Sequence, residues 1–229
     1  MPSLVYPNKQ VAAERYIYSL LPLLYLPLWK RDGGAVVSDD ATGSLFTVTG
    51  AVKTPQGRRF DGVDDRLQTT LRMVNIKGDS GSVLAWVRKE GPGSTGGNGT
   101  IIEKGWASQY GLRVPNEGTI QVRFLEATGA ATLNWTSARV WVEVGKWVQI
   151  GFIFKRPTAH IVVNGQIVES NTWDYDIVES ANQWCVVGGV TTPGAWVING
   201  LIGEIVATHR GLSQLEALNY FNITKWRYL

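Results

Sequence analysis

The chain contains few of the residue types that form disulfides or bind zinc. Its 229 residues include one cysteine, two histidines and two methionines. A single cysteine cannot form a disulfide within the chain, and the apolar neighbours of Cys185 predict a buried side chain. Two distant histidines and one cysteine offer no ligand set for zinc. The missing disulfides favour a microbial or viral source over a secreted animal module.

Strong net charge and long apolar runs are also missing. Lys and Arg number 22 against 19 Asp and Glu, a net charge of +3, and they form no dense basic run that would indicate nucleic-acid binding. The most apolar run, residues 16–29, is short for a membrane span and contains Pro22 and Pro27. Glu14 in its leading region and the absence of a small-x-small cleavage site argue against a signal peptide. We therefore expect no nucleic-acid partner, no membrane insertion and no classical secretion.

The abundant residues predict a single all-β domain. Hydrophobic residues make up 44% of the chain and charged residues 18%, which is enough to bury a large core. The 26 glycines indicate many turns and little helix. Ten tryptophans are more than a sandwich interior is expected to hold, so some should lie at the surface.

The clearest local pattern is a pair of apolar runs within residues 145–165. Trp147, Phe152 and Phe154 lie among β-branched residues, and a short link containing Pro157 ends that run. A second run, residues 160–163, ends at Asn164-Gly165, which is the strongest short turn signal. The pattern predicts a β-hairpin followed by a third strand that starts at Gln166.

Four stretches together resemble the laminin-G-like branch of the concanavalin A-like lectin/glucanase superfamily. They are the central hairpin, the turn Phe60–Asp65, the strand Val83–Val87, and the closing strand from Gly200 with Leu212, Ser213 and Glu216 after it. Their order covers roughly residues 22 to 222. The resemblance implies an antiparallel two-sheet jelly-roll sandwich with a short C-terminal helix. It does not fix the function, because this superfamily includes lectins, hydrolases, receptor modules and virion parts.

We assign residues 22–229 to this jelly-roll domain and residues 1–21 to an N-terminal arm. Asn8 is a candidate cap for a short helix over residues 11–15. The arm also carries the apolar residues Tyr6, Tyr16, Ile17 and Tyr18, which need a surface to pack on. Two surfaces are open at this point: the arm's own sandwich, or a neighbouring copy or partner protein.

Periodicity predicts the remaining elements. Beyond the hairpin, strands are expected over 23–29, 45–49, 58–60, 66–70, 82–89, near 101, 110–114, 119–126, 131–135, 140–143, 181–188 and 200–208. Residues 30–42 and 91–99 are expected to be loops. Ser213 and Glu216 form a capping box that predicts a helix to about residue 222. We expect Leu215, Leu218 and Phe221 to pack that helix against one sheet edge.

Two catalytic patterns can be weighed from the sequence. The glucanases of this superfamily use a Glu-x-Asp-x-Glu triplet on one strand, which would place carboxylates on one face. Asp174-Tyr175-Asp176 is the nearest match, but Val178 stands where the third acid belongs, and Glu204 has no acid two residues away. Gly78-Asp79-Ser80-Gly81 resembles a serine-protease loop, but both histidines follow the serine. We therefore expect no catalysis.

Glycan binding and calcium binding are the remaining site chemistries. Loop aromatics beside polar residues suit sugar stacking. The candidates are Trp173, Tyr175, Asp174, Asp176, Trp106 and Trp135. Trp86, Trp147 and Trp184 alternate with aliphatic residues and are expected in the core.

Asp61, Asp64 and Asp65 could supply oxygen ligands to Ca²⁺, but we favour turn hydrogen bonds and expect no cofactor. Many members of the resembled family have Asp at the position of Gly203, so this chain departs from their pattern there.

Two functions follow from these observations. The first is a non-catalytic structural or display protein of a larger assembly, such as a phage capsid or tail accessory protein, with glycan binding as an added role. Its expected location is a virion or an extracellular surface assembly, and its expected partners are copies of itself or a capsid or tail protein. The alternative is a free-standing carbohydrate-binding lectin module, with glycoside hydrolysis as a third and less favoured reading.

Overall fold

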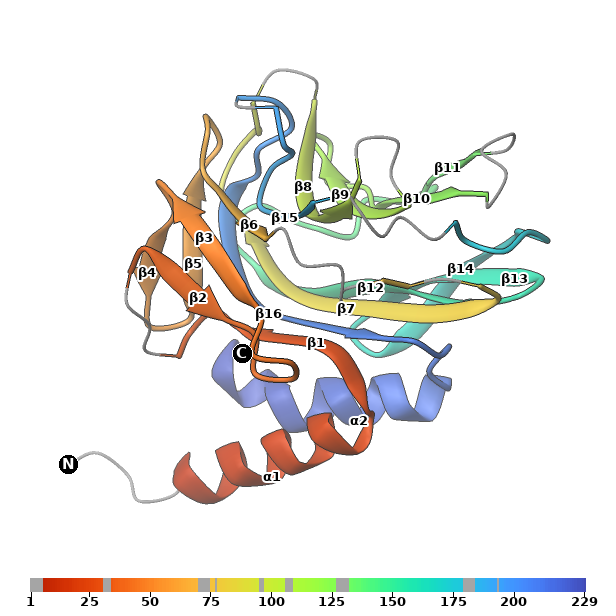
Figure 1. Cartoon of the computed structure of the whole chain (residues 1–229), viewed down its shortest axis with the longest axis horizontal. Coiled ribbons are helices and arrows are strands. Elements are labelled where there is room, and N and C mark those ends of the chain that lie inside the picture. Colours follow the sequence, from red (N-terminus) through yellow and green to blue (C-terminus); the bar gives the residue numbers. More distant parts are fainter. Residues whose placement is uncertain are drawn as a thin grey trace.

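The computed structural model describes residues 6–30, 34–69, 75–76, 78–94, 97–105, 109–126, 132–178, 184–192 and 194–229. Within these residues, two antiparallel sheets pack face to face as a jelly-roll sandwich, and two helices form a third layer beneath one sheet (Figure 1). The predicted fold class is therefore confirmed. Neither helix is long and apolar enough, over the residues described, to cross a bilayer.

The sheet next to the helices is called sheet A. Its strands follow the order β14 (Gln166–Thr172), β13 (Thr158–Val163), β12 (Trp147–Lys155), β7 (Ser80–Lys89), β16 (Asn199–Thr208), β5 (Gly57–Asp61) and β4 (Val52–Thr54), with β1 (Pro22–Pro27) also paired to β16. Its inner face carries alternating apolar residues such as Ile150, Phe152 and Phe154 of β12, all of them fully buried. These residues form one side of the main core.

The opposite sheet is called sheet B. It follows the order β11 (Thr132–Thr136), β10 (Gln121–Leu125), β9 (Tyr110–Pro115), β8 (Asn98–Lys104), β15 (Cys185–Val187), β6 (Arg66–Thr69), β3 (Leu45–Thr49) and β2 (Val36–Ser38). Phe124 of β10 meets Phe152 across the core, with ring centroids 5.0 Å apart. Cys185 lies in this core as predicted, and burial raises the pKa of its thiol to about 12.

The central hairpin has the predicted geometry. Strand β12 pairs with β13 from Lys155↔Thr158 to Ile150↔Val163, and β13 turns into β14 at Asn164-Gly165. Asn164 has φ 49° and Gly165 φ 76°, the positive values that a type I′ turn requires at both positions. A Cβ at Gly165 would lie 2.6 Å from the backbone of Leu218, so the turn also fits tightly under the C-terminal helix.

The N-terminal helix is longer than predicted. Helix α1 spans Tyr6–Ser19, so Asn8 lies within its first turn and is not the cap. Pro7 is compatible with the first turn of a helix, because the backbone N–H that proline lacks would have no partner within the helix there. Ala13 is buried, and Ile17 and Leu20 pack with residues of sheet A and of the C-terminal helix. The arm therefore packs on its own sandwich through this face.

The C-terminal helix α2 (Gln214–Thr224) begins at the predicted capping box, and the 3₁₀ helix η1 (Lys225–Arg227) follows it. Its buried residues are Ala217, Tyr220 and Thr224, whereas Leu215 is 65% exposed. The prediction was wrong for Leu215, whereas Phe221 does pack and stacks on Trp86 with ring centroids 5.5 Å apart. The helix lies flat on the outer face of sheet A rather than against an edge, and polar hydroxyls of its inner face bond to the sheet (Figure 1).

Several strand assignments differ from the prediction. The strand expected over 181–188 is β15, which spans only Cys185–Val187, and residues 181–183 lie outside the described residues. The expected loop over residues 30–42 contains β2, and β4 was not predicted. Both are three-residue strands at sheet edges, too short to show alternation. Residues 140–143 are not a strand, because the amides of Trp141 and Val142 both donate to the carbonyl of Gly118 instead of forming a ladder.

Candidate functional site

The predicted aromatic group at residues 173–176 does not form an open binding surface. Trp173 is only 5% exposed, and its ring lies in the core with its centroid 6.4 Å from that of Phe124. Expecting Trp173 at the surface was wrong, because the chain turns inward after β14 and uses the indole to close this end of the sandwich. Tyr175 covers Trp173 from outside and is 45% exposed.

The two carboxylates of this group already have a cationic partner. Arg156 Nε lies 3.3 Å from Asp174 Oδ1, and Arg156 Nη1 lies 3.1 Å from Asp176 Oδ1. These ion pairs join the β12–β13 turn to the loop after β14. Both carboxylates remain largely exposed, so such pairs add little stability. The group therefore offers Tyr175 and two partly neutralised acids rather than paired stacking surfaces.

The other predicted tryptophans separate into distinct environments. Trp106 lies outside the described residues. Trp135, on β11, is half-buried and packs against the main core. Among the residues expected in the core, Trp86 is fully buried, but on the outer face of sheet A beneath α2. Trp184 is 42% exposed, so its assignment to the core was wrong.

Trp135 lines an open hollow, which we call the Trp135–Trp141 groove. The groove lies between the edge strands β11 and β14 of the two sheets and has a volume of about 530 Å³. Its lining consists of Trp135, Ala138, Arg139, Trp141, Val168, Glu169 and Ser170. It therefore combines two indole rings with a cation, a carboxylate and a hydroxyl.

A break in strand regularity brings three consecutive β14 residues to the groove. The β13–β14 register shifts between Ile161 and Val162, so that Ile161 pairs with Glu169 and Val162 with Ile167. Side chains of a regular strand point to alternate faces, so Val168 and Glu169 could not both face one hollow. The bulge at Val168 changes the direction of these side chains, so that both Val168 and Glu169 face the groove.

Glu169 holds the segment of residues 138–141 that lines the groove opposite β14. Its two carboxylate oxygens accept from the amide of Ala138 at 3.0 and 3.1 Å, and its Oε1 lies 3.5 Å from Trp141 Nε1. These contacts hold segment 138–141 against β14 and orient the Trp141 ring. Ser170 Oγ lies 2.7 Å from His160 Nδ1 on the neighbouring strand. Burial lowers the pKa of His160, which favours a neutral ring near pH 7.

Sequence reasoning missed most of this groove. Trp141 falls in Val140-Trp-Val-Glu143, which was expected to be a strand, and Trp141 was not among the candidate binding residues. Arg139 and Glu169 carry no local signal, because their roles depend on two strands that lie side by side only after folding. Only Trp135 was identified in advance.

The acidic turn at residues 61–65 forms the expected turn hydrogen bonds. Asp65 Oδ2 accepts from the amide of Asp61 at 2.9 Å, and Asp61 Oδ1 accepts from the amide of Val63 at 2.8 Å. Carboxylate oxygens of Asp61, Asp64 and Asp65 lie within 4.8 Å of one another, which is compatible with a cation. Burial and the neighbouring charges of Asp61 and Asp64 raise the pKa of Asp65.

Glu204 was also considered as a catalytic carboxylate in the sequence analysis. Its side chain is fully buried beneath the helices. It accepts from Arg227 Nη1 at 2.6 Å, Tyr220 Oη at 2.9 Å and Trp29 Nε1 at 3.0 Å. An acid that is closed off by three donors cannot reach a glycosidic oxygen. Its role is to anchor the C-terminal segment on sheet A.

Residues 60–217 match the concanavalin A-like lectin/glucanases superfamily, and the chain belongs to this superfamily. The Trypanosoma rangeli sialidase is similar in structure, with a TM-score of 0.65 and 15% identity over 93% of this chain and 37% of that chain. The binding domain of botulinum neurotoxin serotype G is also similar, with a TM-score of 0.67 and 16% identity over 89% of this chain and 51% of that chain.

These similarities establish the fold. The chain spans between about a third and a half of the length of these structures. One of the Trypanosoma rangeli sialidase structures contains sialic acid. The comparison with curated proteins gave no match.

Proposed function

We propose that this chain is a non-catalytic carbohydrate-binding jelly-roll domain that holds glycan in the Trp135–Trp141 groove. The observation that carries the proposal is the pairing of two indole rings with Arg139, Glu169 and Ser170 around one open hollow of about 530 Å³. This size lies within the range of small-ligand sites.

The groove has the chemistry that sugars require. The C–H face of a pyranose stacks on an indole ring, and its hydroxyl groups exchange hydrogen bonds with charged and hydroxyl side chains at the rim. Glu169 can accept from a sugar hydroxyl, and Arg139 can donate. The Trp141 ring is already oriented by its contact with Glu169, so little freedom is lost on binding.

The lining of the groove also supports binding without hydrolysis. Glycoside hydrolysis in the common mechanism needs two carboxyl groups on opposite sides of the scissile bond. Glu169 is the only acidic residue among the lining residues, and its oxygens already accept from the Ala138 amide. The superfamily and the sialic-acid complex of a structural neighbour support a sugar as ligand, but they do not identify it.

The proposal is tested with a glycan array followed by calorimetric titration of the best ligand. Arg139 and Ser170 are exposed, so the double variant Arg139→Ala, Ser170→Ala should fold normally and bind at least about tenfold more weakly. Trp135→Ala should abolish detectable binding. Trp184→Ala removes an exposed tryptophan that does not line the groove and serves as the matched control.

Two results would contradict the proposal. One is an array without any bound glycan. The other is a ligand whose affinity is the same in the Arg139/Ser170 variant as in the unaltered protein, because that ligand would bind elsewhere.

We propose an assembly role as a second candidate, that of a capsid or tail accessory protein on a virion or an extracellular surface assembly. The observation that favours it is the apolar surface left on and after α1, where Val11 is 47%, Tyr18 42% and Leu21 77% exposed. Such residues suit contact with another copy or a partner protein. Deleting the arm would remove the buried residues of α1 and uncover the apolar residues of sheet A and α2 that they cover. Surface substitutions are therefore the sharper test.

The variant Val11→Lys, Tyr18→Lys keeps the buried face of α1. If the protein associates through this surface, light scattering should show a smaller mass for the variant than for the unaltered chain. An unchanged mass with an intact melting temperature would remove this candidate.

A further inference from the structure

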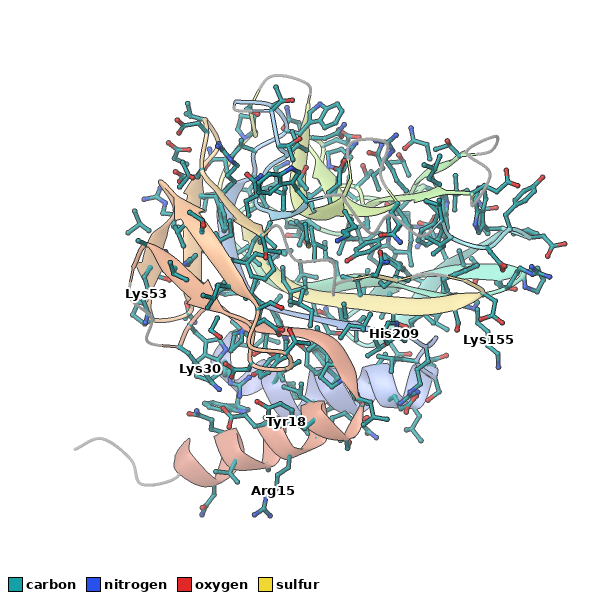
Figure 2. All side chains as sticks on the ribbon, in the orientation of Figure 1. Arg15, Tyr18, Lys30, Lys53, Lys155 and His209 are labelled. Carbon is teal, nitrogen blue, oxygen red and sulfur yellow. The ribbon has the colours of Figure 1, made fainter. Side chains whose placement is uncertain are left out.

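Arg139 is the one cation among the described residues that line the Trp135–Trp141 groove. Its side chain is exposed, and its backbone is held in place because its carbonyl accepts from Ser137 Oγ at 2.8 Å. In Figure 2 the labelled Arg15, Lys30 and Lys53 lie around the helices and β4, on the side of the molecule away from β11. Arg139 therefore supplies the positive charge of this groove.

This arginine has no carboxylate partner within the part of the chain that the structure describes. Other exposed arginines do pair: Arg59, Arg156 and Arg210 each have a nitrogen within 3.0, 3.3 and 2.6 Å of a carboxylate oxygen. Each of those guanidinium groups already has an anion beside it. The Arg139 guanidinium, beside two indole rings, remains available to an anion that a ligand brings.

Glu169, the acid of the groove, is engaged elsewhere. Its carboxylate accepts from the amide of Ala138 and contacts Trp141 Nε1, and no ion pair joins it to Arg139 among the described residues. The groove therefore has two chemically distinct parts. One is an acceptor at Glu169, and the other is a cation at Arg139.

The shape of the guanidinium indicates which group it would bind. Its N–H groups form a planar fork that matches two oxygens of a carboxylate or of a tetrahedral oxyanion in parallel. A neutral hydroxyl accepts only one such bond and carries no charge to pair with. An anionic ligand group therefore uses Arg139 more fully than any hydroxyl does.

We propose that the sugar bound in the groove is acidic, with a carboxylate or sulfate group paired to Arg139. Its hydroxyl groups donate to Glu169, and its ring lies on the indole surface of the groove. Repulsion from Glu169 keeps the anionic group at the Arg139 end, so the two charges fix the direction in which the sugar lies. This inference rests on the proposed function and narrows its ligand from a sugar to an anionic sugar.

The experiment compares acidic sugars with neutral twins. The best acidic ligands of the glycan array are titrated into the full chain by calorimetry, beside their carboxyl-reduced or desulfated forms. These treatments remove the anionic group and leave the ring in place. The neutral twin should bind at least about tenfold more weakly, because it loses a charge-assisted pair of hydrogen bonds. Binding of carboxylated ligands alone would assign a carboxylate to Arg139, and binding of sulfated ligands alone a sulfate.

Two variants tie this difference to Arg139. Arg139→Gln should lower the affinity for the acidic ligand to about that of its neutral twin, and should change the affinity for the twin far less. Arg139→Lys keeps the charge without the planar fork and should give an intermediate affinity. Arg15→Gln removes an equally exposed charge on α1, far from β11, and serves as the matched control that leaves both affinities unchanged (Figure 2).

The outcomes separate this inference from the proposed function. Neutral twins that bind as tightly as the acidic sugars would overturn the inference and leave glycan binding in the groove intact. An acidic ligand with the same affinity for Arg139→Gln as for the unaltered chain would also overturn it, because its anionic group would be recognised elsewhere. An array without any bound glycan would overturn both.

Discussion

Tyr228 lies flat against Trp86, with ring centroids 4.6 Å apart and an interplanar angle of 25°. Gly203 lies directly under this tyrosine, and a Cβ at that position would come within 2.3 Å of the Tyr228 ring. The aspartate that many family members carry there has no room in this chain. The C-terminal segment therefore occupies space on sheet A that the substitution to glycine leaves open.

We expect this contact to contribute substantially to stability. Tyr228→Ala removes a buried ring that stacks on Trp86 and should lower the free energy of unfolding by about 3 kcal/mol. Circular dichroism should show a melting temperature about 6–12 °C lower. Leu229→Ala, at a position that is 73% exposed, is the control and should be nearly neutral. Equal melting temperatures for both variants would show that the segment is not anchored through this ring.

Trp173 and Tyr175 should behave differently although they are two residues apart. Trp173→Ala empties a core position and should cost about 3 kcal/mol in chemical denaturation. Tyr175→Ala loses one exposed aromatic contact and should cost less than about 1.5 kcal/mol. A Trp173→Ala protein that keeps its stability but loses glycan binding would restore Trp173 as a ligand-contacting residue.

The capping box of α2 should make stability depend on acid pH. Hydrogen bonding from Arg210 is the main cause that lowers the pKa of Glu216 to about 2, against an ordinary value of about 4.3. Because the folded-state pKa is lowered, the stabilisation is present above about pH 4.3 and is lost as pH falls toward 2.

Comparing the chain with Glu216→Gln by urea denaturation checks this expectation. The stability difference should be largest above about pH 5 and should shrink toward pH 2, where the glutamate itself is protonated. A difference that stays constant over this range would assign the effect to shape rather than charge.

Calcium should leave the protein unchanged. Asp61 and Asp65 already accept backbone amide hydrogens within their turn, and burial raises the pKa of Asp65. Millimolar CaCl₂ should therefore not shift the melting temperature. If Ca²⁺ did bind, a free concentration 100 times its dissociation constant would add about 2.7 kcal/mol to the free energy of unfolding. A rise that disappears in Asp64→Asn would instead establish a calcium site in this turn.

Local patterns predicted the elements whose structure is decided locally. Asn164-Gly165 formed its turn because few other dipeptides accept two positive φ values, and Ser213 with Glu216 fixed the start of α2. The position of Cys185 in the core also followed from its apolar neighbours. In each case the neighbours in sequence are the neighbours that decide the conformation.

The remaining features depend on residues far apart in the sequence. Trp173 looked like a surface residue because its neighbours are polar, yet it contacts Phe124 across the sandwich. The groove needs Glu169 beside Ala138, and Arg227 packs beside Trp29. The inner face of α2 was misjudged because its hydroxyls find partners in sheet A, such as Trp86 Nε1 with Thr224 Oγ1 at 2.9 Å. No single window of sequence contains both members of such a pair.

The contact between α1 and α2 has a consequence for how the chain folds. Tyr16 donates to the carbonyl of Glu216, a partner 200 positions away. During synthesis α1 can contact β1 early, but its partner α2 is missing until nearly all of the domain has been made, and contacts of such long range form slowly. The apolar residues that α1 packs against α2 then stay exposed through most of synthesis, so we expect chaperone binding and aggregation during translation to involve this helix.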